Sequence, residues 1–301
     1  MENENVGEHV IMECPLVSVV IPTLNSEKTL EACLDSVGGQ TYPNIEIVVV
    51  DGGSVDRTVD IATATGAKVI NANVQSMTKQ TNIGINGSHG KYLYRVDSDV
   101  ILDPDIVESS VNKCETEGYD GVCIFWLPDE SISFWAKIRK IEKESYIEHP
   151  NYVGATKYNK NVLGARFLRR DVLENIGGFD EEIPTLGEDY ALYNKLAKSD
   201  FNFALINSRE RHIGEPRKIK DIIRKNFRYG TALTAFIKEQ KGGLRQFAPT
   251  GRTYLKTAFK RAFKKDFKLF LGLIIYIFTV YASTATGMVY YRVTKKTKRV
   301  A

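Results

Sequence analysis

Short runs of β-branched, apolar residues alternate with longer amphipathic segments from Val17 to Trp126, and no other feature constrains the fold as strongly. Such runs are typical of buried strands, whereas apolar residues that recur every three or four positions are typical of helices. Strands that alternate with helices form a mostly parallel sheet with helices on its faces, so we expect an α/β domain. Strands are expected over 17–21, 45–50, 68–71 and 92–96, and helices after Ser26, over 54–65, over 78–86 and after Asp103-Pro104.

The pattern beyond Trp126 is less regular. A basic stretch over 164–170 leads to a helix toward Ile176 and to a turn at Gly177-Gly178-Phe179-Asp180. Gly187-Glu188-Asp189 then begins a helix through Ala197, where acidic side chains in the first turn are favoured by the helix dipole.

Segment 269–291 contains no charged side chain. A helix of this length measures about 35 Å, enough to cross the hydrocarbon core of a bilayer. We expect a membrane-spanning or membrane-embedded helix, and its hydroxyl residues leave a buried core helix as the alternative. Lysine and arginine cluster on both sides, so we expect anionic lipid rather than nucleic acid as the counter-charge.

The 301 residues are 43% hydrophobic and 26% charged, which suits one large α/β domain with an appendage. The four cysteines form no CxxC pair, which argues against a zinc site or a disulfide scaffold. The N-terminus lacks the basic and apolar regions of a secretory signal, so the catalytic domain is expected in the cytoplasm. The expected boundaries are an extension 1–15, a catalytic domain 16–215, a basic juxtamembrane region 216–268, a transmembrane helix 269–291 and a basic tail 292–301.

Acidic side chains follow two of the expected strands. Open α/β sheets bind ligands beyond the carboxyl ends of their strands, where this sequence places Asp51 and Asp97-Ser98-Asp99. No glycine-rich dinucleotide or P-loop motif follows any of these strands. Two carboxylates separated by a serine suit a divalent cation beside substrate phosphates, and a solvated acidic loop is the alternative.

Several short motifs occur in a fixed order: VSVVIPTLNSE over 17–27, VVVDGGSVDRT over 48–58, VDSD over 96–99, GGFDE over 177–181 and GED over 187–189. This combination resembles the glycosyltransferase family 2 module over about 17–212. The resemblance implies the α/β GT-A fold of nucleotide-diphospho-sugar transferases, a mostly parallel sheet with flanking helices, followed here by the C-terminal membrane helix. It also implies an inverting transferase that uses Mg²⁺ or Mn²⁺.

The resemblance implies roles for individual residues. Asp189 would be the general base that deprotonates the acceptor hydroxyl, and Glu188 and Arg170 would face the acceptor or the diphosphate. Asp99 and His212 would hold the metal, with a surface histidine as the equal alternative for His212. The donor nucleotide would contact Pro22, Thr23, Leu24, Asn25, Asp51, Asp97 and Ser98.

The expected partners are a nucleotide-sugar donor, a lipid-linked or glycan acceptor and a membrane. Two alternatives stay open: a polyprenyl-phosphate glycosyl synthase, and a non-catalytic membrane-tethered module that binds nucleotide sugars. Gly52 stands where many relatives carry a second Asp, and Leu24 replaces a commoner aromatic residue, so the nucleotide is left open. Glu27 lies one residue later than in dolichyl-phosphate mannose synthases, which favours a glycan-chain transferase.

Aromatic residues follow the last expected strand. Aromatic faces suit sugar rings and lipid chains, so these residues are candidates for an acceptor platform, with ordinary core packing as the alternative. They are Trp126, Phe134, Trp135 and Tyr146.

Overall fold

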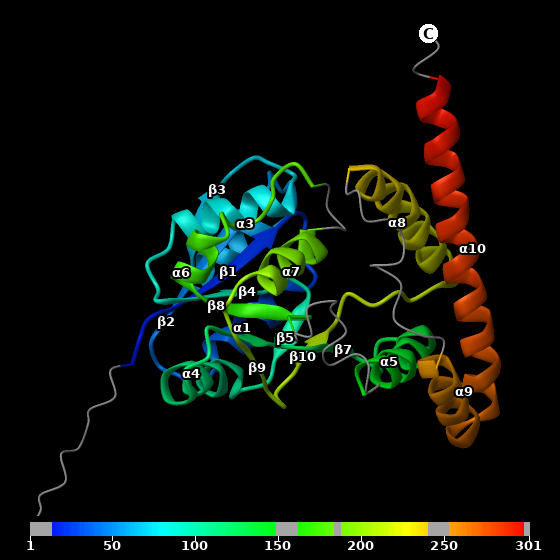
Figure 1. Cartoon of the computed structure of the whole chain (residues 1–301), viewed down its shortest axis with the longest axis horizontal. Helices are drawn as coiled ribbons and strands as arrows, with labels where there is room; N and C mark the ends of the chain where they lie inside the picture. The colour runs from blue at the N-terminus through cyan, green and yellow to red at the C-terminus, as the bar shows by residue number, and fades with distance from the viewer. Residues whose placement is uncertain (1–13, 149–161, 184–187, 240–252, 298–301) are drawn as a thin grey trace, which may run out of the picture.

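The structure is a computed structural model that describes residues 14–148, 162–183, 188–239 and 253–297. A sheet domain lies beside a layer of helices from the C-terminal part of the chain (Figure 1). The predicted alternation of strands and helices is confirmed, and the first strands pair in parallel. These strands are β1 (Val17–Thr23), β2 (Ile45–Asp51), β3 (Lys68–Asn71) and β4 (Tyr92–Arg95).

In the described chain the central sheet has seven strands in the order β3-β2-β1-β4-β8-β6-β9. β8 (Ala165–Arg169) runs antiparallel to β4 and to β6 (Gly121–Cys123), and β9 (Phe203–Leu205) runs parallel to β6. A second sheet contains β5, β10 and β7. The strands β5, β6, β7, β9 and β10 have three residues each, too few for a periodic pattern, and the charged residues of β8 hide its apolar pattern, so none of the six was expected as a strand. The second sheet consists of β5 (Val100–Leu102), β7 (Trp126–Pro128) and β10 (Glu210–His212).

Helices cover both faces of the central sheet. Successive side chains of a strand point to opposite faces, so β1 buries Val17, Val19 and Ile21 in one cluster and Val20 in another. The first cluster includes side chains of α1, α2 and α4, and the second includes side chains of α6 and α7. The helices of this domain are α1 (Leu30–Gly38), α2 (Thr58–Ala64), α3 (Met77–Asn86), α4 (Ile106–Glu117), α6 (Arg170–Asn175) and α7 (Glu188–Lys198).

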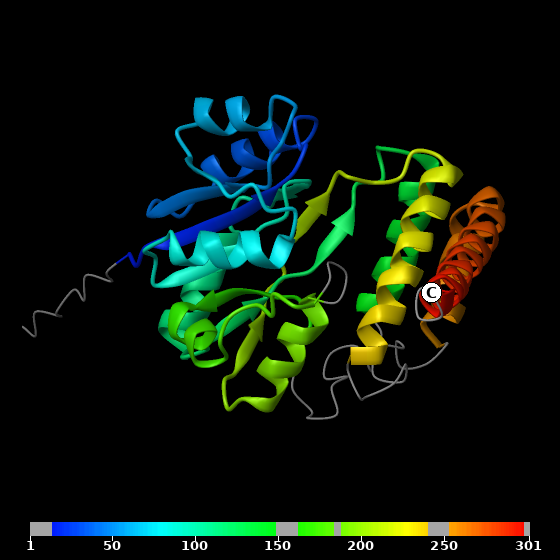
Figure 2. The same ribbon diagram turned by 90° about the horizontal axis from the view of Figure 1, so that it is seen from above.

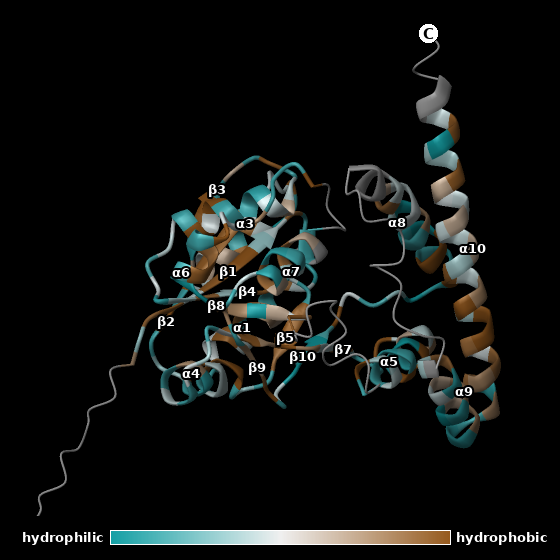
Figure 3. Ribbon diagram, in the orientation of Figure 1, coloured by the Kyte–Doolittle hydropathy of each residue, from teal (hydrophilic) through white to brown (hydrophobic). Residues whose placement is uncertain are grey.

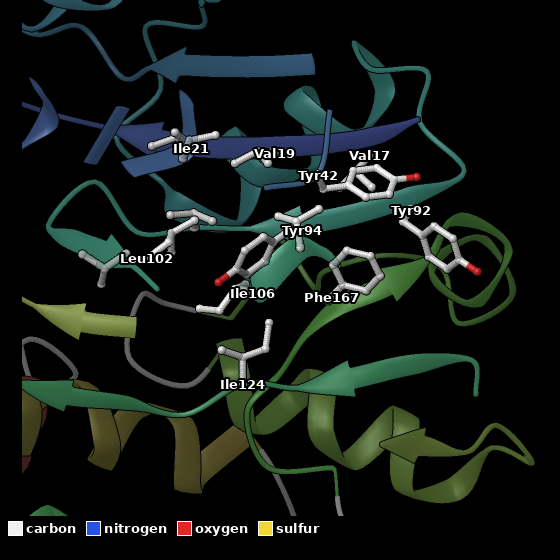
Figure 4. Packing of buried hydrophobic residues seen from close by; sticks show 14 of the residues in the cluster. Val17, Val19, Ile21, Tyr42, Tyr92, Tyr94, Leu102, Ile106, Ile124 and Phe167 are labelled. Carbon is white, nitrogen blue, oxygen red and sulfur yellow. The ribbon is translucent and has the colours of Figure 1, made fainter. Parts of the chain in front are cut away.

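Aromatic rings fill the core where β4 meets β8 (Figure 4). The rings of Tyr92 and Phe167 are stacked with their centroids 5.0 Å apart, and the ring of Tyr94 lies 6.1 Å from that of Phe167. All three residues are almost completely buried. These contacts join the parallel half of the sheet to the antiparallel strand β8.

Two helices begin later than the sequence predicted. Ser26 does not cap α1, because the helix begins at Leu30 with Thr29 at its N-cap position, and the hydroxyl of Ser26 lies 2.9 Å from that of Ser98 instead. The carboxylate of Asp103 accepts the amide of Arg209 instead of capping α4, so this helix begins at Ile106. The predicted buried face of α4 is confirmed: Ile106, Val107, Ser110, Val111 and Cys114.

The C-terminal helices form a layer beside the sheet domain (Figure 2). Residues of α5, α9 and α10 share one apolar cluster with Ile222 of α8. Positions 267–294 of α10 are long and apolar enough to cross a membrane, and their most apolar 18-residue window has a mean hydropathy of 1.8. Figure 3 shows the apolar colouring mainly in the half of this helix next to α9. The layer consists of α5 (Phe134–Ile147), α8 (Ile219–Glu239), α9 (Thr253–Lys265) and α10 (Phe267–Thr297).

Glycine allows α8 and α10 to approach closely. A Cβ atom at Gly287 would lie 2.1 Å from the carbonyl oxygen of Phe227, and one at Gly230 would lie 2.1 Å from that of Thr284. Because both obstacles are backbone atoms of the facing helix, side-chain rotation does not relieve them. The two helices therefore pack through this glycine contact.

We predict that Gly287→Ala destabilises the protein although alanine is the better helix former. The added methyl group would force α8 and α10 apart, at a cost of about 1–3 kcal/mol. Gly38→Ala in α1 is the control, because no atom lies within 4 Å of its added Cβ, and it should be neutral or stabilising by up to about 1 kcal/mol. Thermal unfolding of the detergent-solubilised chain measures both; equal midpoints for the two variants would contradict the close contact.

Candidate active site

The loops that follow β1, β2 and β4 meet at one edge of the central sheet. β1 lies between β2 and β4, and all three run in the same direction, with Thr23 opposite Asp51. The expected ligand-facing residues therefore lie together at the carboxyl ends of these strands. Of the donor-side residues, Leu24 is exposed, whereas Thr23 and Asp51 are buried.

Asp51 shapes the turn that follows β2. Its Oδ2 accepts the amides of Gly53 and Ser54 at 2.9 and 2.8 Å. A Cβ atom at Gly52 would lie 2.2 Å from Nε2 of Gln80. The side chain of Gln80 therefore occupies the space that a side chain at position 52 would take.

Hydrogen bonds tie the loop after β1 to the loop after β2. The amide of Asn25 donates to Ser54 Oγ at 2.8 Å, and the amide of Val55 donates to Asn25 Oδ1 at 3.0 Å. The hydroxyl of Ser26 also lies 2.9 Å from that of Ser98 in the loop after β4. The three loops thus form one connected surface.

Asp97 is held between two buried arginines. Its Oδ1 lies 3.2 Å from Arg95 Nη2, and its Oδ2 lies 2.6 Å from Arg166 Nη2. Burial alone would raise the pKa of Asp97, but the charges of Arg166 and Arg95 outweigh burial and hold this pKa well below its ordinary value. Arg166 also pairs with the fully buried Glu210 at 2.9 Å, and Tyr94 donates its hydroxyl to the same carboxylate.

The same charge network reaches Asp189 in the first turn of α7. Arg95 Nη1 lies 3.0 Å from Asp189 Oδ1, so one guanidinium bridges Asp189 and Asp97. The side chain of Asp189 is 35% exposed, whereas Glu188 beside it is buried. Asp189 is therefore the member of this acidic pair that solvent or a substrate can reach.

The glycine turn before α7 is fixed by side chains of two helices. Gly177 and Gly178 have φ values of 71° and 63°, which an L side chain rarely adopts. Asn82 of α3 accepts the amide of Phe179 and donates to its carbonyl, and Lys195 of α7 donates to the carbonyl of Gly178. The turn predicted from sequence thus connects α3 with α7.

Asp99 and His212 meet where β5 pairs with β10. His212 Nε2 lies 3.2 Å from Asp99 Oδ2, and His212 Nδ1 lies 2.8 Å from the buried carboxylate of Glu215. Burial alone would lower the pKa of His212, but the nearby carboxylates of Asp99 and Glu215 raise it above its ordinary value. A Cβ atom at Gly214 would lie 2.1 Å from Asp99 Oδ2, so glycine keeps this space open.

Arg170 does not lie with these residues, which corrects the position expected for it. Its guanidinium donates to the carbonyls of Gly90 and Ile85 and to the hydroxyl of Ser88, at the end of the sheet where β4 begins. β8 runs antiparallel to β4, so residues at the end of β8 lie away from the edge that carries Asp97. Arg166, near the start of β8, is the arginine that reaches this edge.

Sequence reasoning did not single out Arg95, Glu210 or Glu215. Arg95 ends an otherwise apolar strand, two residues before Asp97, and a charge in such a run is a signal of a buried ion pair. Glu210 and Glu215 carry no such signal, because their partners lie on distant segments. Among the four candidate platform aromatics, Trp126 and Tyr146 line a common cavity, whereas Trp135 packs in the apolar cluster of the helical layer.

The model of glycosyl transferase family 2 matches residues 18–177, more than half of the chain. The chain belongs to glycosyltransferase family 2. It is 27% identical to glycosyltransferase AglE of Haloferax volcanii over 228 residues, 72% of each chain. It is 34% identical to the putative glycosyltransferase EpsH of Bacillus subtilis over 111 residues, 35% of this chain and 32% of the relative. The match to EpsH, like that to an uncharacterized glycosyltransferase of Rickettsia felis, spans about a third of the relative's length.

Solved structures confirm the GT-A fold of this glycosyltransferase. The mannosyltransferase PcManGT of Pyrobaculum calidifontis, in complex with GDP-Man and Mn²⁺, is similar with a TM-score of 0.59 at 18% identity, over 92% of this chain and 87% of that one. TarS 1-349 of S. aureus, in complex with UDP, is similar with a TM-score of 0.53 at 16% identity, over 92% and 91%. At these identities the likeness concerns the fold.

We predict that Arg166→Met destabilises this glycosyltransferase by about 3–5 kcal/mol, because it leaves Asp97 and Glu210 without their shared partner. Arg169→Met on the same strand is the matched control. Arg169 pairs with Asp120 and Asp171 at the surface, and its loss should cost at most about 1 kcal/mol. Chemical unfolding measures the change in unfolding free energy of both variants. Equal losses in the two variants would contradict a larger stabilisation by the buried ion pairs of Arg166.

Proposed function

We propose that this family 2 glycosyltransferase moves a sugar from a nucleotide-diphosphate donor to a lipid-linked or glycan acceptor, with inversion at the anomeric carbon. One observation supports this most directly: Arg95 joins Asp97, at the donor edge of the sheet, to Asp189, at the start of α7. The two carboxylates therefore flank a common space at which donor and acceptor can meet.

In this proposal the connected loops after β1, β2 and β4 bind the donor nucleotide. The backbone from Pro22 to Asn25, the turn organised by Asp51, and Ser98 line the same edge. Asp97 is held rigidly by two arginines, so it offers a fixed acceptor for a sugar or ribose hydroxyl. Gln80 fills the space next to Gly52, so groups other than a second carboxylate contact the nucleotide base of the donor here.

Asp99 and His212 are the proposed metal ligands. Asp99 Oδ2 and His212 Nε2 lie 3.2 Å apart, so both could hold the same divalent cation. Among the described residues, no three His, Cys, Asp or Glu side chains converge on one cation position, so diphosphate oxygens would complete the coordination. A bound Mg²⁺ or Mn²⁺ supplies neutralisation of the charge that develops on the leaving diphosphate.

Asp189 is the proposed general base. The acceptor hydroxyl attacks the anomeric carbon, the bond from that carbon to the diphosphate oxygen breaks, and the hydroxyl proton passes to the carboxylate of Asp189. Arg95 holds this carboxylate in place, with its Nη1 3.0 Å from Asp189 Oδ1. A single displacement of this kind inverts the configuration of the anomeric carbon.

Membrane attachment through α10 belongs to the same proposal. This helix is apolar over a length that can span a bilayer, and only 33% of its most apolar window is buried against the rest of the protein. Basic residues of α9 precede it, while Lys298 and Arg299 of the basic tail lie outside the described residues. We propose that the catalytic domain acts in the cytoplasm, at the membrane face.

The donor is tested with a panel of nucleotide sugars and detergent-solubilised full-length protein. We expect hydrolysis or transfer of one donor that depends on Mg²⁺ or Mn²⁺, and Asp99→Ala should abolish the metal dependence. Absence of turnover and of binding for every donor would overturn the proposed enzyme and favour a non-catalytic role.

The base is tested separately with Asp189→Asn. We expect transfer to fall at least about 100-fold, because the amide does not accept the acceptor proton, while donor binding stays nearly intact. Asp200→Asn, an exposed acid after the same helix, is the matched control and should leave transfer unchanged. Equal losses of donor binding and of transfer in Asp189→Asn would contradict the assignment of the base.

A further inference from the structure

A cavity of about 260 Å³ lies between the sheet domain and the helical layer. A single water needs roughly 10–15 Å³ of such space, so the cavity has room for a phosphate group with part of an attached chain. Trp126 of β7 and Pro216 form its wall on the catalytic side. The other walls come from α5, α8, α9 and α10, through residues such as Tyr146, Tyr229 and Tyr276.

Three cationic side chains line this cavity: Arg139, Lys143 and Lys225. Arg139 is already paired, since its Nη1 donates to both oxygens of the buried Glu215 at 2.6 Å. Glu142 is the acidic residue of the lining, and its carboxylate accepts the hydroxyl of Tyr254 at 3.4 Å. The two lysines therefore carry positive charge that this single carboxylate does not balance.

Aromatic rings are the partners of both ammonium groups. Lys143 Nζ lies 4.2 Å from the ring centroid of Trp126, and Lys225 Nζ lies 5.8 Å from that of Tyr229. Within the part of the chain that the structure describes, neither ammonium lies within 4 Å of a carboxylate. Burial and the charge of Arg139 lower the pKa of each lysine to about 8.

The cavity shares a wall with the proposed metal site. The ring of Trp126 lies 5.0 Å from that of His212. On the same side, Glu215 contacts both Arg139 of the cavity and Nδ1 of His212. An anion in the cavity would therefore lie next to the place where the donor diphosphate is expected.

We propose that Lys143 and Lys225 bind the phosphate of a lipid-linked acceptor, with the lipid chain leading toward α10. The inference rests on the proposed transferase function and names the chemical class of its acceptor. Two unbalanced ammonium groups select an anion, and the aromatic walls suit the apolar chain next to it. Tyr276 places α10 itself in the wall of the cavity, so the chain has a direct path to the membrane-facing helix.

The experiment measures binding of farnesyl phosphate to the detergent-solubilised full chain by calorimetry. Lys143→Gln combined with Lys225→Gln should weaken binding at least about ten-fold, since two charged contacts are lost. The matched control combines Lys137→Gln with Lys220→Gln, which removes the same charge from exposed positions of the same two helices. The control should bind farnesyl phosphate as the unaltered protein does.

Two further probes separate the parts of the ligand. Inorganic phosphate and uncharged farnesol should both bind much more weakly than farnesyl phosphate. Inorganic phosphate that bound equally well would overturn the lipid-linked acceptor in favour of a free phosphate, and farnesol that bound equally well would overturn the role of the lysines.

Metal-dependent binding of the donor is measured on the same samples and keeps this inference separate from the proposed function. Suppose that Lys143→Gln/Lys225→Gln and its control bind farnesyl phosphate equally well, while donor binding is unchanged in both. This result would overturn the cavity assignment and leave the proposed function standing. Loss of farnesyl phosphate binding only in Lys143→Gln/Lys225→Gln supports the cavity assignment, even where no donor is turned over.

Discussion

The chain of charges that runs from the partly exposed Asp189 through Arg95, Asp97 and Arg166 to the buried Glu210 is the interaction on which the catalytic domain depends. Charges in a protein interior are tolerated only when partners compensate for the lost water. Each member comes from a different place: β4, the loop after it, β8, β10 and the first turn of α7. Satisfying these charges therefore fixes the positions of both sheets and of α7 relative to one another.

This arrangement also gives the neighbouring carboxylates of Asp97 and Asp99 different roles. Asp97 has both oxygens committed to arginines, so it is a rigid part of the site. Asp99, two residues later, faces His212 at the open edge and is free of arginine contacts among the described residues. The serine between them lies in the turn that joins β4 to β5, and its hydroxyl meets that of Ser26 in the loop after β1.

The sequence was sufficient for elements with several periods of apolar pattern, such as β1, β2 and α4, but not for strands of three residues such as β5 and β10. The meeting of Asp99 with His212 depends on the pairing of those two short strands, so only the family resemblance indicated it. Arg170 was expected at the site and Arg166 was not, because the sequence does not indicate the direction of β8. Because β8 runs antiparallel to β4, its earlier residue Arg166 lies at the edge that carries Asp97. The local sequence does not indicate the direction of a strand.

The helical layer takes part in the organisation of the site. Glu215 is fully buried between Arg139 of α5 and His212 at the end of β10, with an oxygen 2.6 Å from the first and 2.8 Å from the second. Moving α5 away from the catalytic domain would leave this carboxylate buried without its cation, which is a large penalty in a low-dielectric interior. Since α5 also packs against α9 and α10, the position of the apolar helix is linked through Arg139 and Glu215 to the orientation of His212. A change in the position of α10 would therefore alter the orientation of His212, a proposed metal ligand.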